Sequence, residues 1–218
     1  MKDFYERYWQ QRVKKSGTGI SGVADARLFF IKYLLPDKYE LGRVLDAGCG
    51  NGTTLHLLKS VYHFDAYGID ISQTAVDLAK RMGIEAKVAD ITENIPFPDG
   101  YFDVIICSEV LEHLLSPERA LQEIRGVGRD EAIFIFSVPN VGTIGNRLRF
   151  LFGKTIFEEG RYSYSEHLHF WTKSSFENCL RNNGFSVDRV IGRRCNKITT
   201  LPSIAGTLFI RATKVCEE

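Results

Sequence analysis

The chain has 218 residues, of which 44% are hydrophobic and 25% are charged, and its formal net charge is +1. This balance is ordinary for a globular protein and gives no reason to expect a nucleic-acid partner, and no apolar run reaches membrane-spanning length. Because residues 1–15, "MKDFYERYWQQRVKK", lack an apolar signal core, we expect a cytoplasmic location. We expect one domain over residues 1–218, with residues 1–40 as an amino-terminal helical cap.

Five cysteines occupy positions 49, 107, 179, 195 and 216, an odd number without any CxxC pair. We therefore expect free thiols in a reducing compartment rather than a disulfide framework or a metal cluster. Cys49 and Cys107 fall at the ends of predicted strands, where we interpret them as small buried apolar residues and not as nucleophiles.

Strand-like runs alternate with helix-like runs along the chain. The predicted strands cover residues 43–48, 65–70, 85–90, 102–107, 131–138, 185–192 and 206–213. The apolar runs lack polar alternation, which is typical of parallel strands that are covered on both faces. The pattern predicts a doubly wound α/β fold with a seven-stranded, mostly parallel sheet. Because the last two strands leave no room for a helix between them, we expect the last strand to be antiparallel.

Several predicted helices have readable ends. Ser72 can cap a helix that Gly83 ends, and Thr172 can start another. Ser116 followed by Pro117 is typical of a helix start.

Residues 140–171 interrupt the alternation between the fifth predicted strand and its following helix. A connection of this length inside a compact domain is usually a functional lid or a disordered insert. The many aromatic residues of this segment argue against disorder, so we expect a lid-like insertion.

The stretch "VLDAGCGNG", residues 44–52, places three glycines directly after the first predicted strand. Glycines at this point allow a tight turn and let a ligand approach the main chain, at the sheet edge where ligands of such folds bind. The helix that follows offers unpaired N–H groups at its start. The sequence therefore predicts a ligand site at this turn.

The charge of Asp46 indicates which ligand the turn binds. A P-loop is excluded because the turn has no lysine, and a dinucleotide fingerprint has a different glycine spacing. An anion at Asp46 would repel a pyrophosphate but suits a ligand with a positive charge, such as a sulfonium. This favours S-adenosylmethionine and disfavours an NAD-dependent dehydrogenase.

Two further acids end the next two predicted strands. Asp70 follows Asp46 at a separation suited to binding ribose hydroxyls, and Asp90 can accept a hydrogen bond from an adenine amino group. Ile71 and Ile91 can pack on the adenine ring. Each acid alone could be a helix cap or a solvated loop residue, but three at successive strand ends favour a cofactor site.

Several stretches of the chain resemble one family: "VLDAGCGNG", "YGIDIS", "VADITENIPFPDGYFDVIICSEVLEHLLSPERALQEI" and "HFWTKSSFENCLRNNGF". They are similar to class I S-adenosylmethionine-dependent methyltransferases, and within them to the type 11 small-molecule enzymes that include the ubiquinone-biosynthesis O-methyltransferases. The resemblance implies that Ser108 also lies near the cofactor. The expected cofactor-binding residues are Asp46, Gly48, Cys49, Gly50, Asp70, Ile71, Asp90, Ile91 and Ser108.

The stretch "SEVLEHL", residues 108–114, is the candidate catalytic motif. If it is helical, Glu109, Glu112 and His113 share one face. The ubiquinone-pathway enzymes have a similar E-x-x-E-H, which by resemblance implies a divalent metal; alternatively the acids are solvated or pair with Arg119. We expect Glu109 and His113 to be catalytic, with His113 as a base or positioning group, and the presence of a metal stays open.

The remaining candidates lie in the insertion. His167, His169 and Trp171 are expected to contact the substrate, although hydrogen-bonded packing at a lid hinge is an alternative. Residues 146–157 form a basic amphipathic segment, which we interpret as a substrate lid; a dimer contact and contact with a membrane surface are the alternatives.

We therefore expect a methyltransferase that acts on an oxygen or nitrogen of a small molecule. The insertion after "SVPN" is also similar to that of methionine-biosynthesis W-type proteins. The resemblance to those proteins implies an alternative function, that of an S-adenosylmethionine-binding accessory factor with a methyltransferase-like fold. The sequence leaves the methyl acceptor and the oligomeric state open.

Overall fold

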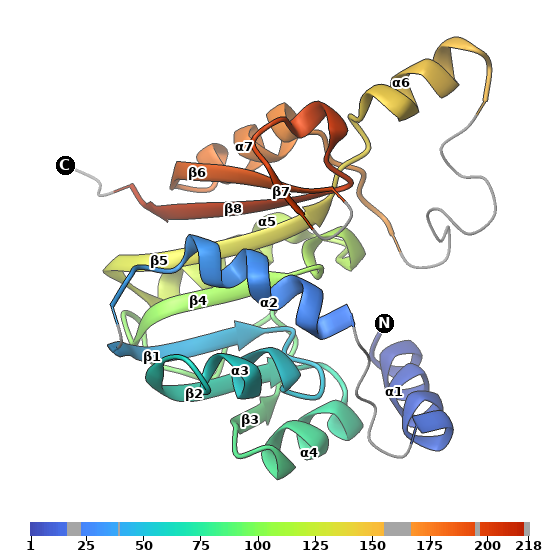
Figure 1. The fold of residues 1–218 in the computed structure, drawn as a ribbon. Helices are drawn as coiled ribbons and strands as arrows, with labels where there is room; N and C mark the ends of the chain where they lie inside the picture. Colours follow the sequence, from blue (N-terminus) through green and yellow to red (C-terminus); the bar gives the residue numbers. More distant parts are fainter. Residues whose placement is uncertain (17–22, 39, 155–166, 195–196, 216–218) are drawn as a thin grey trace.

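The computed structural model describes residues 1–16, 23–38, 40–154, 167–194 and 197–215 (Figure 1). The strands are β1 (Glu40–Ala47), β2 (His63–Asp70), β3 (Glu85–Val88), β4 (Phe102–Ser108), β5 (Gly128–Pro139), β6 (Phe185–Arg194), β7 (Lys197–Thr199) and β8 (Thr207–Lys214). The helices are α1 (Lys2–Ser16), α2 (Val23–Leu34), α3 (Thr53–Leu58), α4 (Gln73–Arg81), α5 (Pro117–Val127), α6 (Ile144–Leu151) and α7 (Lys173–Asn182). Two short 3-10 turns cover Leu111–His113 and Pro202–Ile204.

The strands form one sheet in the order β3-β2-β1-β4-β5-β8-β6-β7. The pairs from β3 to β5 are parallel, and β8 lies antiparallel between β5 and β6. The predicted α/β class, the mostly parallel sheet and the antiparallel last strand are thus confirmed. The sheet has one more strand than predicted, because β7 has only three residues and carries no readable periodicity.

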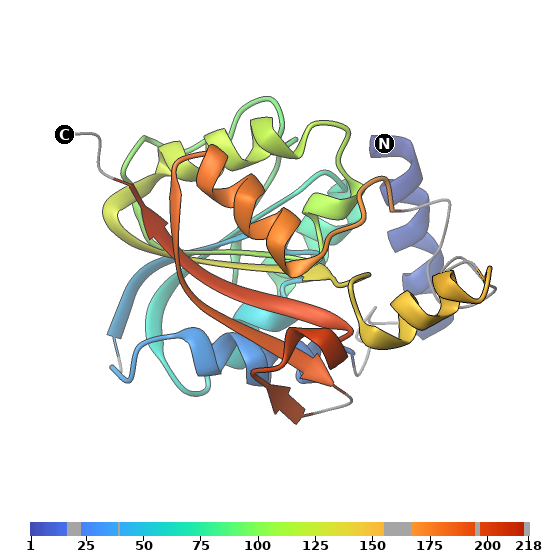
Figure 2. The same cartoon turned by 90° about the horizontal axis from the view of Figure 1, so that it is seen from above.

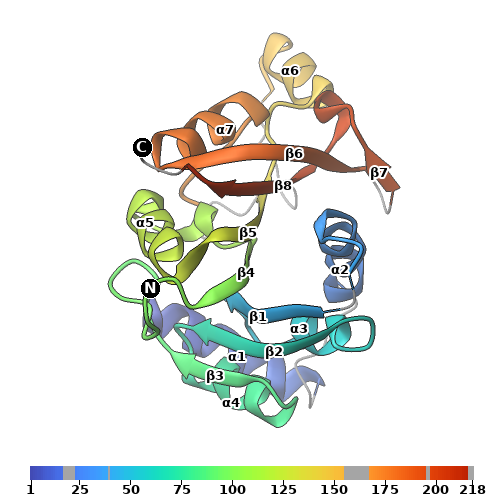
Figure 3. The same ribbon diagram turned by 90° about the vertical axis from the view of Figure 1, so that its left-hand side faces the viewer.

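Both faces of the sheet are covered by helices. Along β5, Phe134 and Phe136 belong to one apolar cluster, whereas Ile133 and Ile135 belong to the other. Figure 2 shows α5 and α7 over one face and α2 over the opposite face, and Figure 3 shows the same layers from the side. Burial on two faces is why the strand lacks the polar alternation of a half-exposed strand.

The predicted helix ends are present. The side chain of Ser72 accepts a hydrogen bond from Ala75 N, and Thr172 forms a reciprocal capping box with Ser175. Gly83 has a φ of 76°, in the left-handed region that glycine adopts without steric cost. Ser116 is the N-cap of α5 but makes no side-chain cap bond, so Pro117 provides the recognisable start of that helix.

Two helices stand apart from the layers. Helix α1 packs beside α4 at the carboxyl ends of the parallel strands, and α6 projects away from the sheet (Figure 1). Residues 155–166 of the predicted insertion, and therefore part of the amphipathic segment 146–157, lie outside the described residues. None of the described helices is long and apolar enough to cross a membrane.

The cysteines agree with the sequence where they are described. Cys49 and Cys107 are buried, and they and Cys179 are free thiols. Burial raises the pKa of the Cys49 and Cys107 thiols well above the ordinary value, which leaves them unreactive. Cys195 and Cys216 lie outside the described residues.

Candidate active site

The turn after β1 is held by hydrogen bonds to the end of β2. The N–H groups of Gly48 and Cys49 both donate to Ile69 O, at 2.8 and 2.9 Å. The next N–H, of Gly50, donates to Asp70 Oδ2 at 2.9 Å. Because this amide is already bonded to a carboxylate, it is not free to bind a pyrophosphate, which agrees with the exclusion of a dinucleotide.

At two glycines of the turn, a larger residue would force neighbouring side chains to move. Gly48 and Gly50 have φ values of 88° and 52°, and a Cβ on Gly48 would overlap the side chain of Val110. A Cβ on Gly50 would lie 2.6 Å from Cζ2 of Trp9, which belongs to α1. Glycine is therefore required both by the backbone conformation and by the close approach of neighbouring side chains.

A cavity of about 250 Å³ lies against this turn. All nine residues that the sequence predicts to bind the cofactor line it, namely Asp46, Gly48, Cys49, Gly50, Asp70, Ile71, Asp90, Ile91 and Ser108. The predicted catalytic residues Glu109 and His113 line the same cavity. They come together because β1, β2 and β4 are neighbouring parallel strands that end at the same edge of the sheet.

The two outer acids are partly engaged by their own loops. Asp70 uses its second oxygen, Oδ1, to accept from Ser72 N at 2.9 Å. Asp90 Oδ1 accepts from both the N–H and the hydroxyl of Thr92, at 2.9 and 2.6 Å. These bonds fix the orientation of each carboxylate, and the lone pairs that remain can accept from a ribose diol or an amino group.

More acidic than basic side chains line the cavity. Its lining includes the carboxylates of Asp46, Asp70, Asp90 and Glu109 and the guanidinium groups of Arg12 and Arg27. Burial raises the pKa of Asp46 to about 7, with the charge of Arg27 opposing the shift and Asp70 adding to it. A cation beside Asp46 would favour its ionised form, so this environment suits a sulfonium better than a phosphate.

Helix α1 forms one wall of the cavity. Its contributions to the lining are Phe4, Tyr5, Tyr8, Trp9 and Arg12. The helix is attached through Glu6, which accepts hydrogen bonds from the Ser72 hydroxyl and from the hydroxyl and N–H of Thr74. These bonds lower the pKa of Glu6 to about 2, and they close the aromatic amino-terminal helix over the predicted cofactor site.

The condition under which Glu109, Glu112 and His113 would share one face, a continuous helix over "SEVLEHL", is not met. Only Leu111–His113 is helical, as a single 3-10 turn, and Glu109 has a φ of 58°, which is strained for a residue with a side chain. Glu109 Oε1 accepts from the Ser137 hydroxyl at 3.0 Å, and burial raises the pKa of its carboxyl. The left-handed residue turns Glu109 away from the direction that a continuous helix would give it.

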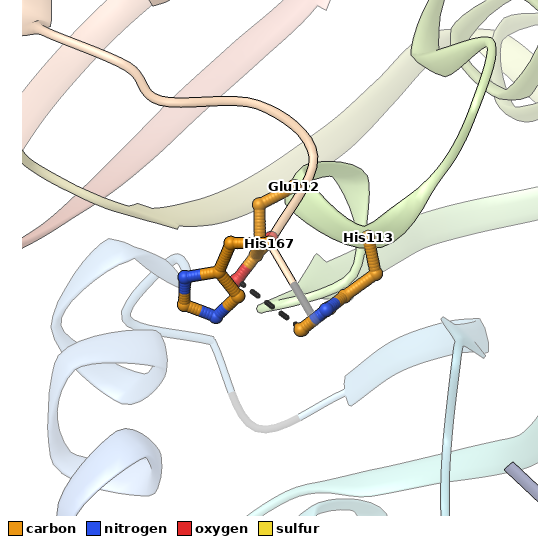
Figure 4. Close-up of side chains that lie close together, drawn as sticks. All are labelled: Glu112, His113 and His167. Carbon is orange, nitrogen blue, oxygen red and sulfur yellow. Dashed lines mark ion pairs between the residues drawn. The ribbon is translucent and has the colours of Figure 1, made fainter. Parts of the chain in front are cut away.

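Glu112 and His113 instead meet His167, which lies near the carboxyl-terminal end of the insertion (Figure 4). Glu112 is fully buried, and in the described part of the chain neither of its carboxylate oxygens has a hydrogen-bond partner. His113 Nε2 lies 3.8 Å from Glu112 Oε1, and the two imidazole centroids are 4.8 Å apart. Glu112 is therefore not solvated, and the structure shows no ion pair between it and Arg119 within the described residues.

The three predicted substrate residues are not found in the cavity lining. His169 Nε2 lies 3.0 Å from Leu114 O, and its ring stacks on Trp171 at 5.5 Å between centroids. The N–H groups of Leu168 and His169 both donate to Glu112 O, at 2.7 and 3.1 Å. This packing joins the returning segment to the loop after β4, and the substrate-binding roles of His167, His169 and Trp171 stay predictions.

Arg27 is a site residue that the sequence did not single out. It lines the cavity from α2, and its Nη1 lies 3.5 Å from Ser108 O. Its charge acts on the carboxyls of Asp46, Glu109 and Glu112, where it opposes the rise in pKa that burial causes. The only available signal was one arginine within the apolar helix "VADARLFFIKYL", which has no local pattern that connects it to Ser108.

Comparison with known proteins agrees with this geometry. Residues 23–190 match a family described as the methyltransferase domain. The chain is 26% identical over 181 residues to the ubiquinone biosynthesis O-methyltransferase of Bordetella avium, which covers 77% of this chain and 72% of that protein. It is 33% identical over 121 residues to the ajmaline N-methyltransferase of Rauvolfia serpentina, which covers 52% of this chain and 41% of that protein.

The solved structures share the fold. A crystal structure of an S-adenosylmethionine-dependent methyltransferase from Thermotoga maritima, described as a possible histamine N-methyltransferase, matches with a TM-score of 0.72. The match has 19% identity and covers 98% of this chain and 97% of that one.

The chain belongs to the methyltransferase domain family, since the match covers most of its length. Its fold is that of the class I S-adenosylmethionine-dependent methyltransferases, and its cofactor is S-adenosylmethionine, as the acid-lined glycine turn predicted. The chain spans only 61% and 41% of the length of two curated relatives that it matches.

Proposed function

We propose that the protein transfers the methyl group of S-adenosylmethionine to an oxygen or nitrogen atom of a small molecule. One observation carries the proposal: Glu109 and His113 line the same cavity as the nine predicted cofactor residues. The O- and N-methyltransferases among the similar proteins support the same class of acceptor atom.

The order of the acids along the sheet edge suggests how the cofactor lies. Asp90, Asp70 and Asp46 lie at the carboxyl ends of β3, β2 and β1, which are neighbours in that order. Asp90 and Asp70 would bind the adenine and ribose, and Asp46 would lie toward the sulfonium. The bound sulfonium supplies an activated methyl group, so the main task of the chain is to align the acceptor with it.

Glu109 and His113 have different proposed roles at the acceptor end. Glu109 would accept the proton that a hydroxyl or ammonium acceptor loses, because its carboxylate is at the cavity wall and is oriented by Ser137. His113 would position the acceptor, since its ring packs edge-on against Tyr5 of α1 at 6.0 Å between centroids. The strained backbone of Glu109 is consistent with a residue kept for chemistry rather than for stability.

A single-turnover assay with labelled S-adenosylmethionine tests the proposal against a panel of phenols, amines and carboxylic acids. We expect label transfer to at least one phenol or amine. The His113→Ala variant should still bind the cofactor but lose transfer. Cofactor binding without transfer to any acceptor would support the alternative of an accessory protein of the methionine-biosynthesis W type. A thermal shift checks binding separately, because a ligand at 100 times its Kd stabilises the folded state by about 2.7 kcal/mol.

We also propose that α6 contacts an anionic membrane surface. Ile144, Leu148 and Leu151 are exposed at the spacing of one helix face, whereas Asn146, on the opposite face, is buried against the body of the protein. The exposed Arg147 and the nearby Lys154 give this region a positive charge. An apolar face flanked by basic side chains is the pattern of a helix that lies in a lipid–water interface. It would place the protein beside an acceptor that is itself lipid-like.

A further inference from the structure

We propose that Glu112, His113 and His167 form a binding site for a borderline divalent transition-metal ion, of which Zn²⁺ is the best probe. Each residue can offer one ligand atom, and these three atoms lie within 4.8 Å of one another. Figure 4 shows the three side chains close together, with the ion pair between Glu112 and His113 marked. The site adjoins the cavity, since His113 also lines it.

The buried carboxylate of Glu112 is the first argument for a cation. Its side chain has an exposed fraction of 0%, and both oxygens lack a hydrogen-bond partner within the described residues. A buried carboxylate without compensation is expensive, so such groups are normally paired or bind a metal. Burial raises the pKa of the Glu112 carboxyl, the like charge of Glu109 adds to the rise, and the charge of Arg27 opposes it. A cation at this point would compensate the group directly.

The types and positions of the three ligand atoms also favour a transition-metal ion. Zn²⁺ binds histidine nitrogen and carboxylate oxygen at about 2.0–2.2 Å, which places neighbouring tetrahedral ligand atoms roughly 3.4 Å apart. In the structure His113 Nε2 and Glu112 Oε1 are 3.8 Å apart and all three ligand atoms lie within 4.8 Å, so the side chains would have to close toward a bound ion. Two imidazoles and one carboxylate suit zinc and its neighbours in the first transition series better than Mg²⁺ or Ca²⁺, which prefer oxygen ligands. Three protein ligands also leave one tetrahedral position open.

The three ligands come from two different segments of the chain. Glu112 and His113 lie on the 3-10 turn after β4, whereas His167 lies on the returning segment near the carboxyl-terminal end of the insertion. Main-chain bonds from Leu168 and His169 to Glu112 O already hold these two segments together. The ion would cross-link them through side chains as well, and would fix the returning segment next to the acceptor end of the cavity.

This ligand set differs from the one that the E-x-x-E-H spacing implies. Glu109 is not part of the cluster, because its left-handed backbone directs the carboxylate to Ser137. His167 replaces it, from a residue 54 positions after His113. The inference does not depend on the proposed methyl transfer, since it concerns a separate group of side chains and can be measured without an acceptor.

Metal binding to the full chain, stripped with a chelator, tests the proposal. We expect one equivalent of Zn²⁺ by titration calorimetry and elemental analysis, a rise in Tm with Zn²⁺, and visible absorption bands when Co²⁺ is used instead. His167→Ala should weaken Zn²⁺ binding by at least about 100-fold, since even the residues behind metal ligands often contribute 10–100-fold. The control His56→Ala removes an exposed histidine on α3 and should leave Zn²⁺ binding unchanged.

Glu112→Gln keeps the proposal testable if the alanine variant folds poorly. The amide has nearly the same shape and removes the buried charge, so the metal-free Tm should stay constant or rise while the response to Zn²⁺ disappears. Absence of stoichiometric Zn²⁺ binding to the unmodified chain, or equal binding by the His167→Ala variant, would overturn the proposal. Retained S-adenosylmethionine binding in each variant shows that the fold is intact, so a negative result says nothing against the proposed methyltransferase activity.

Discussion

Glu6 Oε2 accepts a hydrogen bond of 2.7 Å from the hydroxyl of Ser72, the residue that caps α4. Ser72 N in turn donates to Asp70 Oδ1, and Asp70 Oδ2 accepts from Gly50 N. A continuous chain of hydrogen bonds therefore joins the amino-terminal helix to the glycine turn. The helix that closes the cavity and the turn that forms its floor are mechanically connected.

Replacement of Glu6 by alanine should loosen α1 and weaken S-adenosylmethionine binding by about tenfold. Hydrogen bonds to a charged group contribute ~1.5–3 kcal/mol each, and part of this helps to order the cavity wall. Titration calorimetry measures the change. Asp3→Ala is the matched control, because Asp3 is an exposed acid on the same helix and its side chain makes no contact with Ser72 or Thr74 in the described structure. Equal effects of both variants would show that the Glu6 contacts are unimportant.

Gly50→Ala should weaken cofactor binding much more than Gly83→Ala. Both glycines have positive φ values, so both substitutions carry a left-handed strain of about 1–2 kcal/mol. A Cβ at Gly83 meets nothing within 4 Å, whereas one at Gly50 overlaps the Trp9 indole, which adds about 1–3 kcal/mol. In the Gly50→Ala background, Trp9→Ala should recover part of the folding stability lost through this overlap. Urea denaturation of the unmodified protein, the Gly50→Ala and Trp9→Ala variants and the double variant measures the coupling between the two positions. Additive losses of stability would contradict the contact.

Binding of S-adenosylmethionine should strengthen by up to about tenfold between pH 6 and pH 8. The Asp46 pKa of about 7 means that this carboxyl becomes ionised over that interval, and the ionised form attracts the sulfonium. The charged groups that act on the Asp46 pKa are Arg27, which lowers it, and Asp70, which raises it. S-adenosylhomocysteine has no charge on sulfur, so its affinity should change less. Asp46→Asn should make the affinity of S-adenosylmethionine nearly independent of pH in this range.

Glu109→Gln should reduce the rate of methyl transfer by about 10²–10⁴-fold, the usual contribution of a positioned proton acceptor, with S-adenosylmethionine affinity almost unchanged. Glu109→Gly removes the side chain and also the left-handed strain, so we expect a higher Tm together with the same loss of rate. Rapid-quench single turnovers and thermal unfolding separate the two effects. Full activity of the Gln variant would remove Glu109 from the mechanism.

Replacement of Leu151 by glutamate should abolish sedimentation of the protein with phosphatidylglycerol vesicles. The change puts a charge at the carboxyl-terminal end of the apolar face of α6, where it would have to enter the lipid interface. Leu115→Glu is the matched control, since Leu115 and Leu151 are both 76% exposed and lie on different parts of the surface. Phosphatidylcholine vesicles should bind less strongly than phosphatidylglycerol, because the basic residues near α6 attract anionic headgroups. Absence of binding to both vesicle types would leave the lid and dimer-contact alternatives for this segment.

The sheet, and the meeting of the predicted cofactor residues in one cavity, could be inferred from the sequence because their signals are local. Apolar runs such as "DVIIC" identify buried parallel strands, and residues that follow such strands converge at one edge of the sheet. That rule alone predicts that Asp46, Asp70 and Asp90 lie close together, and all three line one cavity.

The parts of the site that the sequence missed depend on contacts between distant segments. Glu6 meets Ser72 across 66 positions and Arg27 meets Ser108 across 81, and neither pair has a repeating pattern that reveals the contact. The conformation of the "SEVLEHL" stretch was not predictable for a different reason. Its residues have the spacing of a helix, but the left-handed backbone of Glu109 breaks the helix before it begins, and nothing in the residue types announces that conformation.

The antiparallel course of β8 has a practical consequence. Because β8 runs opposite to β5, its last residue, Lys214, lies at the end of the sheet remote from the glycine turn (Figure 1). A fluorescent label or a surface tether next to Lys214 would therefore stay clear of ligands entering the molecule. Immobilised protein prepared in this way should keep the same donor affinity as protein free in solution.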